Sequence, residues 1–174
     1  ESEIELLCKK TGFVVKKIKK INLSKETVKA NAALTGFGNS KTILLGDTLL
    51  KNFTTSEITT VVAHELGHLK KKHILKLLLL SAFFSLFILK FSNLLLNFLF
   101  LKLNISMGSI HVLPLLLIYL TVISFILLPL QNLYSRKLEY EADSFAIQIT
   151  KDKESFVSAL NKLADLNLAN KTPH

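Results

Sequence analysis

Val61-Val62-Ala63-His64-Glu65-Leu66-Gly67-His68 contains the pattern H-E-x-x-H, and the interpretation of the whole chain starts from it. Residues four apart lie on one face of a helix, so His64 and His68 can place two imidazole nitrogens on one metal ion. Glu65 lies one step round the helix, beside the position that the metal leaves open. This spacing suits catalytic Zn²⁺, which takes three protein ligands. The alternative is a surface helix that carries two solvated histidines.

The residues around this pattern favour a helix, which we predict over residues 54–73. Thr54 and Glu57 have the spacing of a capping box, in which each side chain binds the free backbone N–H of the other residue. The following apolar residues recur at helical spacing: Ile58, Val61, Val62 and Leu69. Gly67 costs about 1 kcal/mol relative to Ala inside a helix. A close backbone approach beside a metal would explain this glycine, but the glycine could equally have no structural reason.

The composition points to a membrane protein. The chain has 174 residues, 49% of them hydrophobic, and a mean hydropathy of +0.40, too apolar for an ordinary soluble protein. The net charge is +9, but much of the positive charge flanks apolar runs, so it favours a lipid bilayer and not nucleic acid as a partner. A single cysteine, Cys8, excludes an intramolecular disulfide. We expect one metalloprotease catalytic domain that is a fragment of a longer protein.

Two long apolar runs, residues 74–101 and 110–131, predict a transmembrane helical hairpin. The alternative is a pair of helices buried in a large soluble core. Lysines 70–72 and the pair Arg136-Lys137 lie at one end of the hairpin, whereas the connecting loop carries only Lys102 and His111. The positive-inside rule therefore predicts a cytoplasmic active site in an integral, multi-pass protein. The membrane would be the endoplasmic reticulum in a eukaryote and the inner membrane in a bacterium.

The remaining segments predict a mainly α protein with a small β component. Residues 1–53 form a small α+β layer, in which residues 31–40 are a strand running into a glycine turn and residues 41–45 are its hairpin partner. Residues 13–22 mix apolar residues with lysines and are a further candidate strand. After the hairpin we predict a helix over 132–149, which supplies the third metal ligand, and a C-terminal helix over 153–169.

Six side chains are candidates for the third ligand: His73, His111, His174, Glu139, Glu141 and Asp143. A metzincin would need histidine at position 74, where this chain has Ile74. His111 is expected across the membrane. His73 follows His68 on the same predicted straight helix, so its direction is wrong. The carboxylates of residues 139–143 therefore remain.

If residues 132–149 are helical, one stripe carries Asn132, Arg136, Glu139 and Asp143. Glu141 points away from this stripe, so we choose Glu139 as the third ligand. Asp143, one turn further on, can hold the second nitrogen of a ligating histidine. Arg136 and Asn132 are expected to support the site from behind. The alternative is an exposed row of charges at i, i+4 spacing.

The chain resembles the integral-membrane zinc proteases typified by the type 1 CaaX prenyl protease, over essentially all of its 174 residues. The resemblance rests on four stretches: Asn31–Gly38, Asp47–Leu50, His64–His68 and Ser135–Ala146. It implies a gluzincin-like fold, one Zn²⁺ on His64, His68 and Glu139, and Glu65 as catalytic base. The family's E-x-x-x-D pattern falls on Glu139 and Asp143. Full family members also have further transmembrane helices, which we expect as partners of this chain.

The resemblance implies a membrane endopeptidase that removes the C-terminal tripeptide of prenylated CaaX proteins or peptides. One alternative is a membrane quality-control protease that uses the same zinc chemistry without prenyl specificity. Another is a catalytically silent membrane scaffold that retains zinc. A peptide substrate could add as a strand to the edge formed by Asn31, Ala32, Ala33, Leu34 and Thr35. Ordinary hairpin packing would explain that strand equally well.

A polar stripe interrupts the first apolar run. Lys90 lies well inside the run, and Asn93 and Asn97 share its helical face. A charge at this depth costs at least about 2.5–3.5 kcal/mol on membrane-insertion scales. We expect the three side chains to line a water-filled cavity, as the family's chamber implies. The alternative is a buried pair between Lys90 and an acid from another helix.

Overall fold

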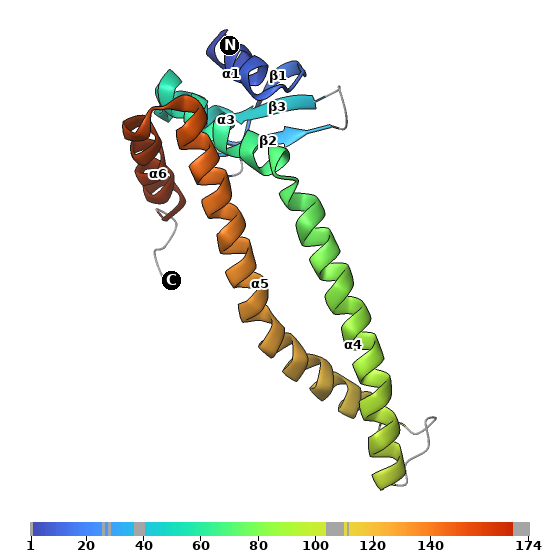
Figure 1. Ribbon diagram of the computed structural model, residues 1–174. Helices are drawn as coiled ribbons and strands as arrows, with labels where there is room; N and C mark the ends of the chain where they lie inside the picture. Colours follow the sequence, from blue (N-terminus) through green and yellow to red (C-terminus); the bar gives the residue numbers. More distant parts are fainter. Residues whose placement is uncertain are drawn as a thin grey trace. The chain divides into compact units, whose positions relative to one another are not determined.

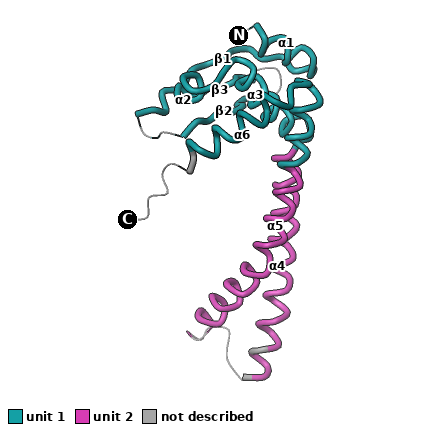
Figure 2. The backbone as a smooth tube through the Cα atoms, turned by 90° about the vertical axis from the view of Figure 1, so that its left-hand side faces the viewer, with its two compact units in different colours: residues 1–72, 139–174 teal, residues 73–138 magenta. Residues whose placement is uncertain are grey.

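The computed structural model describes residues 2–25, 27, 29–36, 41–103, 110 and 112–168. The chain divides into two units, shown in Figure 2. The motif unit comprises Glu1–Lys72 and Glu139–His174, and the apolar unit comprises His73–Leu138. The H-E-x-x-H pattern and the carboxylates of residues 139–143 therefore belong to the same unit.

A three-stranded sheet and a layer of helices make up the motif unit (Figure 1). Its elements are α1 (Ser2–Thr11), β1 (Val15–Ile21), β2 (Ala32–Thr35), β3 (Lys41–Gly46), α2 (Asp47–Asn52), α3 (Thr55–Lys70), the last part of α5 (Val112–Thr150) and α6 (Lys153–Leu168). The central strand β3 runs parallel to β1 and antiparallel to β2. The prediction of a mainly α fold with a small sheet is confirmed. Gly36, the first residue of the expected glycine turn, has a positive φ of 98°, and residues 37–40 lie outside the described residues.

The core of the motif unit forms around α3, which contacts α1, α6 and β2. Val62 and Leu66 are completely buried on its inner face. The predicted capping box is present: the Thr54 N–H donates to Glu57 Oε2 over 2.7 Å, and the Glu57 N–H donates to Thr54 Oγ1 over 3.3 Å. Such a cap stabilises a helix by about 1 kcal/mol.

Two predicted helix boundaries differ from the structure. The helix predicted over 54–73 ends at Lys70, because Lys72 adopts a left-handed φ of 54° and α4 begins at His73. His73 therefore begins a new helix and does not continue the helix of His68, so that prediction was wrong. No break separates the second apolar run from the third-ligand helix, since both belong to α5, with Pro129 inside it. Residue 169, the predicted end of the last helix, lies outside the described residues.

The apolar unit contains α4 (His73–Leu103) and the first part of α5. Both helices are long and apolar enough to cross a membrane, with mean hydropathies of 2.2 and 2.5 in their most apolar windows. Most of their large apolar side chains are exposed, which favours lipid contact over a soluble core. Within the unit, the Tyr119 hydroxyl donates to the Ile88 carbonyl over 3.3 Å.

The polar stripe of α4 lies on an exposed face of the apolar unit. Lys90, Asn93 and Asn97 are exposed, and the Asn97 amide donates to Asn93 Oδ1 over 3.0 Å. Together with neighbouring apolar side chains they line a groove of about 470 Å³. On the opposite face Ser92 is buried, although Ser85 is exposed. The water-filled cavity remains a prediction.

We expect cysteines at positions 90, 93 and 97 of the full-length protein to react with a small membrane-impermeant thiol reagent. The reason is that an intramembrane lysine aligned with two asparagines requires water or polar partners. A cysteine replacing Ser85, on the other face of the same helix, is the matched control and should stay unmodified. Equal protection of all four cysteines would rule out the cavity.

Candidate metal centre

His64 and His68 lie one turn apart on α3, and their side chains converge. Their Nε2 atoms are 3.0 Å apart, and the two rings meet edge to face with centroids 4.8 Å apart. The predicted i, i+4 pairing is therefore present. The alternative of two separately solvated histidines does not fit this geometry.

Glu139, in the part of α5 that belongs to the motif unit, brings a carboxylate to the same point. Its Oε2 lies 3.4 Å from His64 Nε2 and 3.5 Å from His68 Nε2. With metal–ligand bonds of about 2.0–2.1 Å, tetrahedral coordination separates ligand atoms by roughly 3.3–3.4 Å. The three atoms thus fit one tetrahedral Zn²⁺, and two histidines with a glutamate are an established catalytic zinc set.

Asp143 orients one of the two histidines. Its Oδ1 lies 2.8 Å from Nδ1 of His64. If Nδ1 carries the proton, it donates to this carboxylate, and the Nε2 lone pair is left for a metal. Glu139 and Asp143 occupy successive turns of α5, as the predicted stripe requires. Glu141 does not belong to the group of three convergent ligand atoms.

Gly67 lies where α3 and α5 approach each other closely. A Cβ at this position would lie 3.1 Å from the Ala142 Cα and 3.2 Å from the Ala142 carbonyl oxygen, closer than most side-chain contacts. Ala142 itself is completely buried. The absence of a side chain at Gly67 therefore lets α5 approach until Glu139 and Asp143 reach the histidines.

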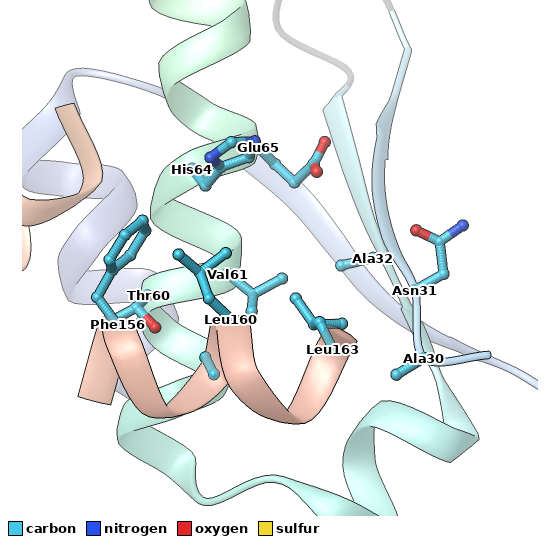
Figure 3. A pocket seen from close by; sticks show the side chains of 11 residues that line it. Ala30, Asn31, Ala32, Thr60, Val61, His64, Glu65, Phe156, Leu160 and Leu163 are labelled. Atoms are coloured by element: carbon cyan, nitrogen blue, oxygen red, sulfur yellow. The ribbon is translucent and has the colours of Figure 1, made fainter. Parts of the chain in front are cut away.

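Glu65 lies beside His64 in a pocket of about 200 Å³ (Figure 3). Burial raises the pKa of its carboxyl group above the ordinary value, and the charge of Glu139 adds to this, whereas His64 acts in the opposite direction. A carboxyl group whose pKa is raised holds a proton more readily, and it can still return that proton to a leaving group. Glu65 thus has the properties of a general base without being a metal ligand.

The rest of the pocket is mainly apolar. Three segments line it: residues 30–32, which lead into β2; Thr60, Val61, His64 and Glu65 of α3; and Phe156, Ala159, Leu160 and Leu163 of α6. Asn31 and Ala32 therefore line the same pocket as His64 and Glu65, and the role of this strand in binding a substrate remains a prediction. Ala33, Leu34 and Thr35 pair with β3 and are not among the residues that line this pocket. β2 is an edge strand of the described sheet.

Sequence reasoning missed the contribution of α6. Its pocket residues recur at i, i+3, i+4 and i+7, so an apolar face could have been predicted from their spacing. That spacing does not say which element the face packs against. Asn132 and Arg136 belong to the apolar unit and are exposed, so their supporting role remains a prediction.

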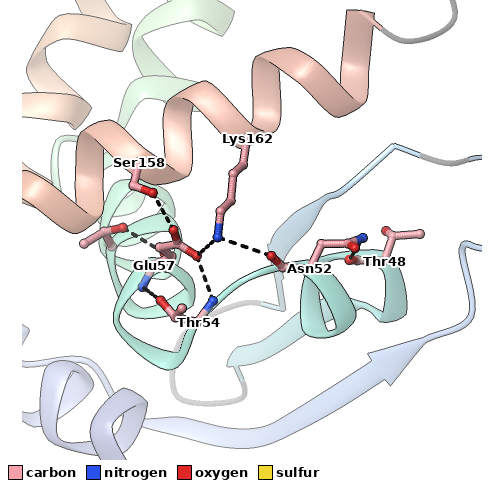
Figure 4. Close-up of polar contacts among 7 residues, drawn as sticks. Thr48, Asn52, Thr54, Glu57, Ser158 and Lys162 are labelled. Carbon is pink, nitrogen blue, oxygen red and sulfur yellow. Dashed lines mark hydrogen bonds and ion pairs between the residues drawn. The ribbon is translucent and has the colours of Figure 1, made fainter.

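A buried carboxylate ties α6 to the first turn of α3 (Figure 4). Glu57 is only 4% exposed and accepts hydrogen bonds from Ser158 Oγ at 2.6 Å and from Lys162 Nζ at 2.8 Å. Burial alone would raise the pKa of Glu57, but these bonds, together with the Thr54 N–H, lower it to about 2. The network thus holds one wall of the pocket against the helix that carries the histidines.

Lys162→Ala is expected to lower the free energy of unfolding by about 1 kcal/mol at neutral pH, because the buried Glu57 carboxylate loses its cation. The hydrogen bonds to Glu57 lower the pKa of its carboxyl group in the folded protein to about 2. The stability that these bonds give is therefore fully present above the ordinary glutamate pKa of about 4.3. It should disappear as the pH falls from about 4.3 towards 2. Thermal unfolding of the wild type and of the variant at pH 7 and pH 3, in the full-length protein, measures this difference in stability. Lys153→Ala, an exposed position on α6, is the control; an equal loss there would contradict the assignment.

The family model of Peptidase family M48 matches residues 1–173 of the chain. The chain belongs to family M48. It is 31% identical over 179 residues to the uncharacterized metalloprotease YhfN of Bacillus subtilis, covering 99% of the chain and 42% of that protein. CAAX prenyl protease 1 of Saccharomyces cerevisiae is 43% identical over 82 residues, or 47% of the chain and 18% of the relative.

A solved structure has a similar fold. The crystal structure of S. mikatae Ste24p aligns with a TM-score of 0.71 and 29% identity, covering 96% of the chain and 43% of Ste24p. The chain therefore spans less than half the length of these relatives. Membership of M48 implies a catalytic metal, and the apolar helices associate the protein with a membrane.

Proposed function

We propose that this M48 chain is the catalytic part of a zinc-dependent membrane endopeptidase. The observation that carries the proposal is the convergence of His64, His68 and Glu139 with Glu65 beside them. A scaffold that only retained zinc would need no unligated carboxylate at this position. Glu65 therefore favours catalysis over a silent structural site.

The chain's own residues have distinct roles in this proposal. Bound Zn²⁺ would supply a Lewis acid and lower the pKa of a water molecule to about 7. Glu65 accepts the proton of the attacking water and returns it to the leaving amine. Asp143 holds His64 in the tautomer that directs Nε2 towards the metal.

The pocket and the neighbouring strand edge suit a peptide substrate. A peptide pairing with the β2 edge would run past Asn31 and Ala32, and an apolar side chain would enter the pocket formed with α6. We infer that the substrate is a prenylated CaaX protein or peptide, from which the enzyme removes the C-terminal tripeptide on the cytoplasmic side. Similarity to CAAX prenyl protease 1 supports this substrate class.

A quality-control protease without prenyl specificity is the second candidate, because YhfN is named only as a metalloprotease.

The test uses the full-length protein in proteoliposomes and two CaaX peptides that differ only in a farnesyl group. We expect kcat/KM to be at least about tenfold higher for the prenylated peptide, a difference of about 1.4 kcal/mol in transition-state binding. Equal cleavage of both would favour the quality-control protease. Bound zinc without cleavage of either peptide would favour the silent scaffold.

A further inference from the structure

Two lysines lie near the ring of Phe13, which is between α1 and β1 in the motif unit. Lys41 Nζ lies 4.3 Å from the centroid of the Phe13 ring, and Lys70 Nζ lies 5.7 Å from it. Lys70 also donates to the Thr11 carbonyl over 3.2 Å, at the C-terminal end of α1. Lys71 and Lys72 follow directly and are exposed. We call Phe13, Val14, Lys41 and Lys70–Lys72 the Phe13 cluster.

The Phe13 cluster has no described counterion. Within the described part of the chain, no carboxylate lies within 4.0 Å of any of its four lysines; the ion pairs there involve other residues. Val14, next to the ring, is 64% exposed. The cluster thus combines four uncompensated positive charges with an exposed apolar side chain, a combination typical of surfaces that bind at a lipid interface.

Chain connectivity limits how far this cluster can lie from the membrane. Lys70 is three residues before His73, the first residue of α4, and three residues of extended chain reach at most about 11 Å. α4 is apolar enough to cross a bilayer. Each headgroup layer extends roughly 5–8 Å beyond the hydrocarbon core. If α4 enters the hydrocarbon core at Ile74, its first apolar and exposed residue, Lys70 lies at or near the headgroup layer.

We propose that the Phe13 cluster binds the phosphate groups of anionic phospholipids in the leaflet where α4 begins. Lys41, Lys71 and Lys72 contact the phosphates, while Lys70 remains on the Thr11 carbonyl and Val14 enters the interface. This contact would fix the motif unit at the membrane surface. The inference rests on the membrane span of α4 and not on the proposed peptidase activity.

The test measures lipid retention by the full-length protein in non-ionic detergent, using native mass spectrometry with added phosphatidylglycerol or phosphatidylcholine. We expect preferential retention of phosphatidylglycerol. Each lysine near a charged surface contributes about fivefold in affinity, so replacing Lys41, Lys71 and Lys72 by Gln should weaken retention about a hundredfold. The matched control replaces Lys19, Lys20 and Lys25, which are exposed and have no described contact with the Phe13 ring. It removes the same charge.

The proposal would be overturned if the protein showed no preference for phosphatidylglycerol, or if both triple variants weakened retention equally. Displacement of the lipid by millimolar inorganic phosphate would also overturn it, because that result indicates a site for free anions. So would binding of an acidic peptide to the cluster, if the variant retained lipid as well as wild type does. Zinc content and thermal midpoint should match wild type in both variants. These readouts separate a failure of lipid binding from a failure of the zinc site.

Discussion

Glu65→Gln is expected to retain zinc and to lower peptide cleavage by about 10²–10⁴-fold, the contribution of a positioned general base. The glutamine preserves the size of the side chain and its place in the pocket beside His64. It cannot accept a proton from water, so the chemical step slows while the three metal-binding side chains are unchanged. The measurements are zinc content per chain and kcat for peptide cleavage in the full-length protein.

Glu154→Gln provides the control for Glu65→Gln, because Glu154 is exposed in the first turn of α6 and lines no part of the catalytic pocket. It should keep both zinc and activity. If Glu65→Gln retained activity within about tenfold of wild type, Glu65 would not be the base. If it lost zinc, the separation between metal binding and proton transfer proposed here would be wrong.

Glu139→Ala should lower zinc affinity by more than about 100-fold, because it removes one of three convergent ligand atoms. Asp143→Asn should have a smaller effect, about 10–100-fold, since Asp143 acts on the metal only through His64. Competition with a chelator of known affinity measures both changes. Circular dichroism confirms that the variants remain folded.

Glu141→Ala is the matched control for Glu139→Ala, since it removes the same side chain two residues along the same helix. We expect its zinc affinity to stay within a few-fold of wild type, because Glu141 lies outside the group of convergent ligand atoms. Loss of zinc in Glu141→Ala, with retention in Glu139→Ala, would show that the helical register of α5 at the site is wrong.

The sequence by itself determined the pairs of side chains that the spacing within a single helix aligns. His64 with His68, and Glu139 with Asp143, are each four residues apart, so one turn of helix aligns each pair. The capping box of Thr54 and Glu57 is local in the same sense, and the apolar runs are detectable from composition alone. In each case the interacting residues are neighbours along the chain, so no packing partner had to be known.

Only the tertiary structure decided how these local features combine. The close approach of α5 to α3 at Gly67 brings the two pairs together, and the Glu57–Lys162 bond holds α6 as a wall of the pocket. The end of α3 before His73 was also missed, because Lys72 has no sequence signal for a left-handed conformation. Contacts between residues about 75 to 105 positions apart depend on which helix and strand faces pack against one another. The spacing of apolar residues in the sequence shows that a helix has an apolar face, but it does not identify the element that covers this face.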